Sequence, residues 1–90
     1  MNISFTKQFN NQLDEITDPA LLSKISKIVA SLMAASDLRN IPHIKKMKGY
    51  TAYYRIKVNS AYRIGLKKTE EGVLLITLRQ RKDIYRSFPR

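Results

Sequence analysis

The chain contains no cysteine, no tryptophan and a single histidine, His43, among its 90 residues. Without cysteine it has neither disulfides nor thiolate ligands for a metal. Typical catalytic zinc sites use three protein ligands, among which histidine or cysteine is prominent. The composition therefore argues against metal catalysis, and we expect no cofactor. His43 stands beside lysines, where a histidine is more often solvated or hydrogen-bonded than catalytic.

Long apolar runs are also missing. No run reaches the 18 or so apolar residues that a membrane-spanning helix needs. The opening MNISFTKQF lacks the basic-then-apolar order of a signal peptide, so we expect a soluble, cytoplasmic protein without a membrane partner. A chain of 90 residues buries one modest core, which predicts a single domain over residues 1–90.

Acidic residues are scarce, with 7 Asp and Glu against 17 Lys and Arg and a formal net charge of +10. Residues 1–38 contain three lysines and four acidic residues, a net charge of −1, whereas residues 39–90 contain fourteen cations and three acids, a net charge of +11. So basic a segment favours a polyanionic partner, and nucleic acid is the first candidate. An anionic membrane is less favoured because no amphipathic helix carries these charges.

The first residues predict a short strand followed by a helix. Asn2 to Phe5 is an apolar start of the kind found at a sheet edge, and Thr6 is placed to cap a helix. Phe9, Leu13 and Ile16 then recur at helical spacing and predict one buried stripe.

Asp18 and Pro19 predict the start of a second helix, as its N-cap and first helical residue. A helical hairpin is expected because the two helices are joined so tightly. A loop over residues 36–42 should follow. The apolar face of the second helix, which lasts to about Ala35, comprises Leu21, Leu22, Ile25, Ile28, Val29, Leu32 and Met33.

The most informative stretch runs from residue 45 to residue 63 and reads KKMKGYTAYYRIKVNSAYR. Two runs of alternating residues flank Asn59-Ser60, a pair suited to a tight turn, and this predicts a β-hairpin. Alternation assigns the residues to two faces of the hairpin. The apolar face comprises Tyr54, Ile56, Val58, Tyr62, Ile64 and Leu66, and the opposite face comprises Tyr53, Arg55, Lys57, Arg63, Gly65 and Lys67.

Like charges that face each other across a hairpin repel, so the cationic face needs a reason. Edge strands often carry Lys and Arg to block aggregation, which is one interpretation; a ligand-binding face is the other. The rest of the chain favours the second.

After a turn in which Gly72 can take the left-handed conformation, the run 73–78 is apolar on both parities, which predicts a central strand covered on both sides. This strand delivers Arg79 and Arg81 to its end, and Ile84 and Phe88 should pack inward from a short C-terminal turn or helix.

A small sheet with both helices on one face would gather the functional candidates on the other. Arg matches phosphate oxygens bidentately, Lys supplies a compact charge, and a Tyr ring can stack on an unpaired base. Together these groups suit single-stranded RNA. The expected catalytic set is Arg55, Lys57, Arg63, Arg81 and Tyr85, and further RNA or phosphate contacts are expected from Lys45, Lys46, Lys48, Tyr53 and Arg79.

The order of KKMKGY, YYRIKV, YRIGLKK, an apolar strand and RQRKDIYRSFP resembles the RelE/ParE superfamily of toxins, and most closely its RelE branch. The resemblance covers nearly the whole chain. It implies an α+β fold in which a short N-terminal strand and a two-helix hairpin pack with a small, twisted, largely antiparallel sheet of about four strands, followed by a short C-terminal segment. It also implies a ribonuclease that cleaves messenger RNA, typically in the ribosomal decoding site. An antitoxin encoded beside it would hold it inactive, and DNA would be reached only through the antitoxin complex.

The resemblance also implies roles for single residues. Arg55 stands where the family's type member has a lysine, Lys57 at its second lysine, and Arg63 at the arginine after the turn. Arg81 and Tyr85 match the late arginine and tyrosine, although their spacing is tighter and the turn looks one residue shorter.

The implied chemistry is attack by a ribose 2′-hydroxyl on the adjacent phosphorus without a metal. Lys57 is the candidate base because the charges of Arg55 and Arg63 disfavour a third cation beside them. Arg63 and Arg81 would clamp the phosphate, Tyr85 would stack on or orient the nucleotide, and Arg81 or a ribosomal group would be the acid. Two alternatives stay open: a ParE-type inhibitor of DNA gyrase on the same fold, and a non-catalytic nucleic-acid or ribosome-binding domain.

Overall fold

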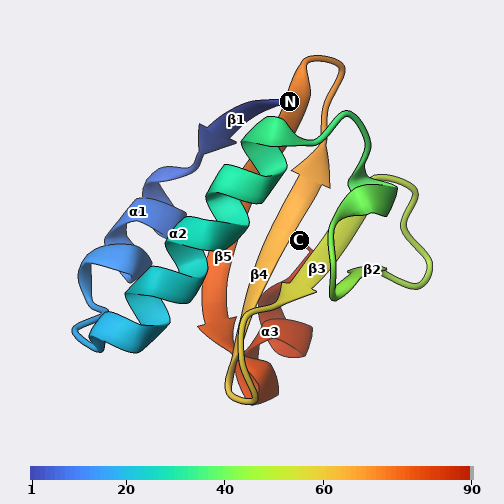
Figure 1. Cartoon of the computed structure of the whole chain (residues 1–90). Coiled ribbons are helices and arrows are strands. Elements are labelled where there is room, and N and C mark those ends of the chain that lie inside the picture. Colours follow the sequence, from blue (N-terminus) through green and yellow to red (C-terminus); the bar gives the residue numbers. More distant parts are fainter. Residues whose placement is uncertain (90) are drawn as a thin grey trace.

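The computed structural model describes residues 1–89, and Figure 1 shows their arrangement. These residues form five strands, three α-helices and one 3-10 turn. In order they are β1 (Asn2–Phe5), α1 (Lys7–Asp14), α2 (Pro19–Ala34), η1 (Leu38–Asn40), β2 (Ile44–Lys46), β3 (Tyr53–Lys57), β4 (Tyr62–Lys68), β5 (Gly72–Gln80) and α3 (Arg81–Ser87).

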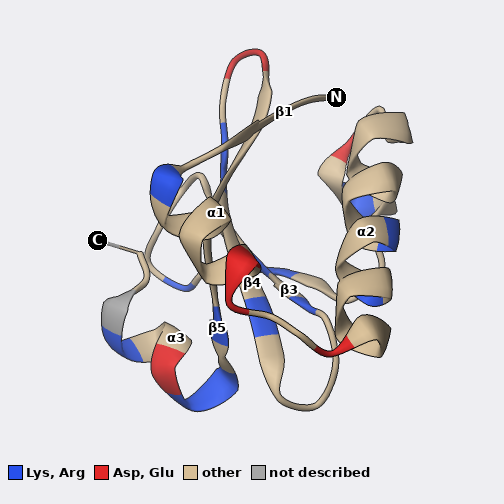
Figure 2. Cartoon of the chain, turned by 90° about the vertical axis from the view of Figure 1, so that its left-hand side faces the viewer, with Lys and Arg blue, Asp and Glu red and all other residues tan. Residues whose placement is uncertain are grey.

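The strands form one sheet in the order β1-β5-β4-β3-β2. β1 runs parallel to β5, and every other neighbouring pair is antiparallel. α2 and α3 lie on opposite sides of this sheet (Figure 2). The expected α+β class is confirmed, with one strand more than expected. The additional strand is β2, which pairs with β3 and contains Lys45 and Lys46. Three residues are too few to show an alternating pattern, so the sequence did not indicate it.

Both helix starts follow the local signals in the sequence. The Thr6 hydroxyl accepts a 3.0 Å hydrogen bond from the Phe9 N–H and donates a 2.7 Å bond to the Ile76 carbonyl of β5. Asp18 accepts from the Ala20 N–H at 3.0 Å, and Pro19 opens α2. The same threonine thus caps α1 and attaches it to the sheet, which explains why the helix begins there.

The main core lies between the sheet and the helical hairpin. Its fully buried side chains include Phe9, Leu32, Ile64 and Leu75. The predicted apolar face of α2 is only partly buried, however: Leu22 is 36% exposed and Met33 is 62% exposed. Both side chains line an open groove beside α1 and β1.

A second, smaller apolar cluster lies under α3. Ile84 and Phe88 are buried there beside Met47, which confirms that the C-terminal segment packs inward. Gly65 makes this packing close, because a Cβ at that position would lie 2.9 Å from ring carbons of Phe88. The face of the hairpin opposite the main core is therefore half covered by α3 and half cationic. Ile76 packs against the same cluster at a bulge where β5 shifts register against β4.

Gly72 serves a purpose that differs from the expected one. It lies within β5, and among the described residues only Gly49 (φ 84°) and His43 (φ 62°) have positive φ. A Cβ on Gly72 would collide with the backbone of Asn2, its partner in β1. The left-handed turn was thus a wrong expectation, and glycine is needed here for the close approach of the parallel strand. No helix within residues 1–89 is long and apolar enough to cross a membrane.

Candidate active site

The sheet lines up three cations at one end. Lys57 of β3 lies opposite Arg63 of β4, and Arg63 lies opposite Arg79 of β5. Two residues before Lys57 in β3, Arg55 lies opposite Lys45 of the edge strand β2. Because directly opposed residues of antiparallel strands place their side chains on the same face, the register itself concentrates positive charge here.

The turn between β3 and β4 holds the central cation in place. The Asn59 side chain accepts hydrogen bonds from the N–H groups of Ala61 (2.9 Å) and Tyr62 (2.7 Å) and so shapes the turn. The Arg63 Nη1 then donates to the Asn59 carbonyl at 2.6 Å and to the Tyr62 carbonyl at 3.0 Å. The guanidinium is therefore folded back onto its own turn and is held there before any ligand arrives.

Arg63 is the one buried charged side chain of the described chain, with 6% of its surface exposed. Its Nε has no hydrogen-bond partner among the described residues. Burial lowers the pKa of Arg63, and the charges of Arg55 and Arg81 lower it further, whereas Tyr85 acts in the opposite direction. Arginine is nevertheless protonated in the resting protein at neutral pH, so a cation stays buried beside two others. A bound anion would relieve that cost.

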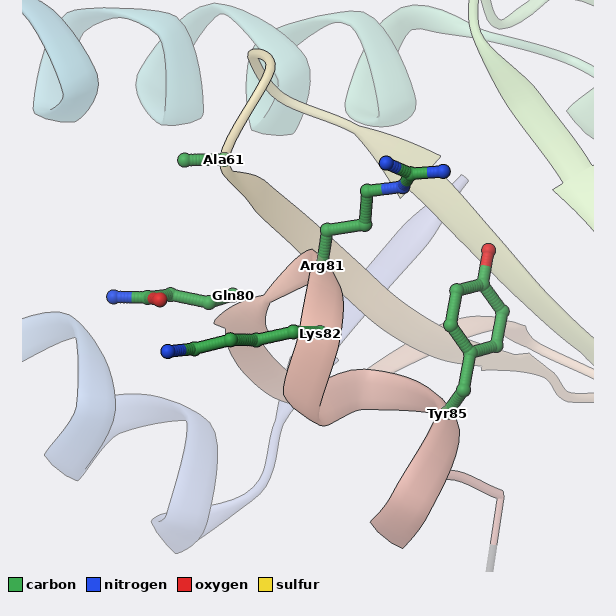
Figure 3. Close-up of a pocket in the computed structure, with 5 residues that line it drawn as sticks. All are labelled: Ala61, Gln80, Arg81, Lys82 and Tyr85. Atoms are coloured by element: carbon green, nitrogen blue, oxygen red, sulfur yellow. The ribbon is translucent and has the colours of Figure 1, made fainter.

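α3 begins on the same turn. The Arg81 N–H donates a 2.6 Å hydrogen bond to the Ala61 carbonyl, which fixes the helix start against the β3–β4 turn. A hollow of about 430 Å³ opens there, lined by Ala61, Gln80, Arg81, Lys82 and Tyr85. In Figure 3 the tips of Arg81 and Tyr85 extend to one side of α3, while Gln80 and Lys82 extend to the other.

Tyr85 is 54% exposed, so it is not a core aromatic. It follows Arg81 by four residues, which places both on one face of α3. The Arg55 guanidinium carbon lies 6.0 Å from the centre of the Tyr85 ring, within cation–π range. β3, β4 and α3 thus bring together Arg55, Arg63, Arg81 and Tyr85, which we call the arginine–tyrosine cluster.

The other predicted residues lie around this cluster. Lys57, although opposite Arg63, also lines a separate hollow against α2. Tyr53 is half-buried and packs edge-on against Phe88, with ring centres 5.6 Å apart. Lys48 lies in the exposed β2–β3 connection, and Lys46 is exposed on β2. The Nε of Arg79 donates to the Thr77 hydroxyl at 3.2 Å.

Sequence reasoning missed the part played by Asn59 and by the hollow-lining Gln80 and Lys82. The sequence marks Asn59 as a turn residue, but nothing local shows that its carbonyl accepts a hydrogen bond from a side chain four positions later. Gln80 and Lys82 are the direct sequence neighbours of Arg81, and this position is the one signal in the sequence that they line the same hollow. Within residues 1–89, no three His, Asp or Glu side chains are grouped so that they could hold a metal ion.

Comparisons with known proteins agree with this fold. No model of a protein family matches the chain. The protein Toxin RelE3 from Methanocaldococcus jannaschii is 32% identical over 90 residues, which cover 99% of this chain and 100% of the relative. The RelB-RelE antitoxin–toxin complex from Methanococcus jannaschii contains a chain with a TM-score of 0.79 and 31% identity, at 96% and 99% coverage of the two chains. The YoeB dimer from Staphylococcus aureus contains a chain with a TM-score of 0.73 at 21% identity. The match covers 88% of this chain and 94% of that chain, and it shows that the two share a fold.

The fold is therefore that of a toxin from a toxin–antitoxin pair. With a full-length relative above 30% identity, the chain belongs to the RelE toxin family.

Proposed function

We propose that the protein is a metal-independent endoribonuclease that cleaves messenger RNA, in the cytoplasm and within the ribosomal decoding site. The burial and the surroundings of Arg63 are the observation that carries this proposal. Arg63 is a buried, pre-oriented cation with an unpaired Nε, between Arg55 and Arg81 and beside an exposed tyrosine. Such an arrangement suits a phosphate that gains negative charge during reaction, because fixed donors stabilise developing charge without reorganising. Toxins of this family are associated with RNA cleavage.

The reaction is a transesterification within the RNA. The 2′-oxygen attacks the adjacent phosphorus and loses its proton to a base, and the bond from phosphorus to the 5′-oxygen of the next nucleotide breaks. An acid protonates that leaving oxygen, so the products are a 2′,3′-cyclic phosphate and a 5′-hydroxyl. The protein must then position the phosphate, stabilise its additional charge and handle two protons.

Each residue of the site has a place in this scheme. Arg63 and Arg81 hold the phosphate oxygens in the transition state, since a guanidinium fork matches two of them. Tyr85 stacks on or orients the exposed base, and Arg55 supports the charge beside its ring. Lys57, opposite Arg63, is the candidate base, and Arg81 or a ribosomal group is the candidate acid. Lys45, Lys46, Lys48, Tyr53 and Arg79 surround this centre as candidate RNA contacts.

Primer extension on messages from cells that briefly express the protein tests the proposal. Arg81→Ala is the control variant, because its side chain is exposed and its loss leaves the core intact. We expect cuts at codon positions with the wild type and none with the variant. Blocking translation initiation should remove the cuts if the ribosome presents the RNA.

Two other outcomes would favour the alternative functions. Intact messages together with growth arrest and DNA damage would indicate a ParE-type gyrase inhibitor. Salt-sensitive RNA binding without any product would indicate a non-catalytic RNA- or ribosome-binding domain. Either result would overturn the ribonuclease assignment.

The protein also has a surface for an antitoxin, which we propose docks on the helical hairpin. An apolar groove of about 470 Å³ lies between α1, α2 and the end of β1. Exposed side chains of Phe5, Leu22 and Met33 line it. Since the similar RelE chain from Methanococcus jannaschii is in complex with RelB, an amphipathic antitoxin segment is the expected occupant. Acidic residues in that partner would neutralise the basic face. Co-purification with the adjacent gene's product tests this.

A further inference from the structure

A second basic hollow lies on the side of the sheet that α2 covers. Its volume is about 210 Å³, and α2, the segment 41–43 and the end of β3 enclose it. Lys24, Lys27, His43 and Lys57 line it, over apolar side chains that include Ile28 and Ile41. It shares no lining residue with the hollow beside Arg81 and Tyr85.

The charges of this hollow all have one sign. None of its lining residues is acidic, although residues 1–38 carry a net negative charge. Two of the three lysines in that segment, Lys24 and Lys27, nevertheless lie here. Their spacing of three places Lys24 and Lys27 side by side on α2, where like charges repel, and Lys57 of β3 contributes to the rim. Figure 2 shows cationic positions on α2 as well as on the strands. An anion between these side chains would turn that repulsion into attraction.

His43, which lines the hollow, has an unusual backbone conformation. Its φ of 62° is the one positive value at a non-glycine residue within the described chain. Its carbonyl accepts a 3.1 Å hydrogen bond from the Lys57 N–H, so the two residues are joined at the rim. A non-glycine residue keeps such a conformation only when its surroundings impose it, and functional sites are common places for it.

Lys57 lies between the basic hollow and Arg63. It lines the basic hollow and lies opposite Arg63 across the β3–β4 pair. An extended anion bound at the arginine–tyrosine cluster can therefore continue past Lys57 to α2 without crossing an acidic side chain of the lining. A polymer with one charge per unit fits this arrangement better than a single small anion does.

We propose that the hollow formed by Lys24, Lys27, His43 and Lys57 binds a backbone phosphate of the single-stranded RNA, next to the phosphate that is cleaved. The lysines supply point charges, His43 donates or accepts a hydrogen bond, and the apolar floor contacts a ribose. The hollow thereby adds length-dependent affinity to the proposed ribonuclease function, on which this inference rests. Apart from Lys57, the candidate base, its residues take no part in the chemistry.

The test compares two double variants with equal charge change. Lys24→Gln with Lys27→Gln removes two cations of the hollow, and Lys7→Gln with Lys68→Gln removes two exposed cations elsewhere. Binding is measured by fluorescence anisotropy at several salt concentrations, with 2′-O-methyl RNA that cannot be cleaved. The two probes have about three and about twelve nucleotides, which spans common single-strand site sizes.

We expect the Lys24/Lys27 variant to bind the longer RNA about tenfold more weakly, with a salt slope shallower by about 0.7 for one lost phosphate contact. Its affinity for the short RNA should stay within about twofold of wild type, and the control pair should bind both probes like the wild type within a similar margin. Equal behaviour of the two double variants would overturn the inference. So would a wild type that binds no RNA, or a Lys24/Lys27 variant that loses only affinity for an acidic antitoxin.

A cleavage assay in parallel separates this inference from the proposed function. If wild type leaves messages intact but binding of the longer RNA depends on Lys24 and Lys27, the ribonuclease proposal fails while the phosphate site stands. If wild type cleaves and both double variants bind the longer RNA equally, the site fails while the function stands.

Discussion

The guanidinium of Arg63 donates a 2.6 Å hydrogen bond to the backbone carbonyl of Asn59, four residues earlier in the chain. This contact, made across the β3–β4 turn, holds a buried cation at the end of the sheet where Arg81 and Tyr85 lie. Among the described residues Nε has no hydrogen-bond partner, and no acidic side chain is among the groups that shift the pKa of Arg63. Such a site is unfavourable for the folded protein alone and favourable for an anionic ligand, which is why stability and function should respond differently to mutation here.

Replacing Arg63 by Met should separate the two effects. We expect cleavage to fall by about 10²–10³-fold, the range for loss of one transition-state donor. The free energy of unfolding should stay the same or rise by about 1 kcal/mol, because an apolar side chain of similar length needs no desolvated charge. Single-turnover cleavage and urea denaturation measure the two. A large loss of stability with unchanged cleavage would contradict the assignment.

Removing the side chain of Asn59 should loosen the turn. Asn59→Ala loses the acceptor for two backbone N–H groups and should lower the free energy of unfolding by about 1–2 kcal/mol. Asn59→Asp keeps an acceptor at the same place and is the matched control. Thermal denaturation of both variants checks this, and equal stability of Ala and Asp would show that the turn does not depend on these bonds.

A methyl group on Gly65 should push α3 away from the sheet. The new Cβ in Gly65→Ala would meet the Phe88 ring at 2.9 Å, and overpacking of this kind costs about 1–3 kcal/mol. Cleavage should fall as well, because α3 carries Arg81 and Tyr85. Combining it with Phe88→Leu should recover part of the loss, since the two sites are in contact. Additive effects in the double variant would refute this coupling.

A charge in the apolar groove should weaken antitoxin binding and leave cleavage intact. Met33→Asp places a carboxylate on an exposed position of the groove, at a cost to folding below about 0.5 kcal/mol because the site is at the surface. We expect the antitoxin affinity to drop at least about tenfold, as for a centrally placed contact. Isothermal titration measures it, with Asn10→Asp on the exposed side of α1 as control. Unchanged affinity would place the antitoxin elsewhere.

Local sequence signals were sufficient for much of the fold. Thr6 and Asp18 cap the two helices as expected, because capping involves only the next few residues. Alternation identified both strands of the β3–β4 hairpin and their faces, because side chains in a strand alternate whatever the surrounding fold. The spacing of Ile84 and Phe88 was enough to predict that the C-terminal segment packs inward.

Tertiary structure decided what these elements do together. In the sequence Arg63 is one more cation on the polar face of a strand, but in the folded protein it is buried. The need for glycine at position 65 becomes clear only from its contact with Phe88, 23 positions later. The exposure of Met33 and the place of Lys57 at the basic hollow likewise follow from how distant segments pack. The sequence by itself determined which residues form helices, strands and caps, because those preferences are local. Burial, charge proximity and open surface depend on neighbours distant in the chain, so only the folded structure set them.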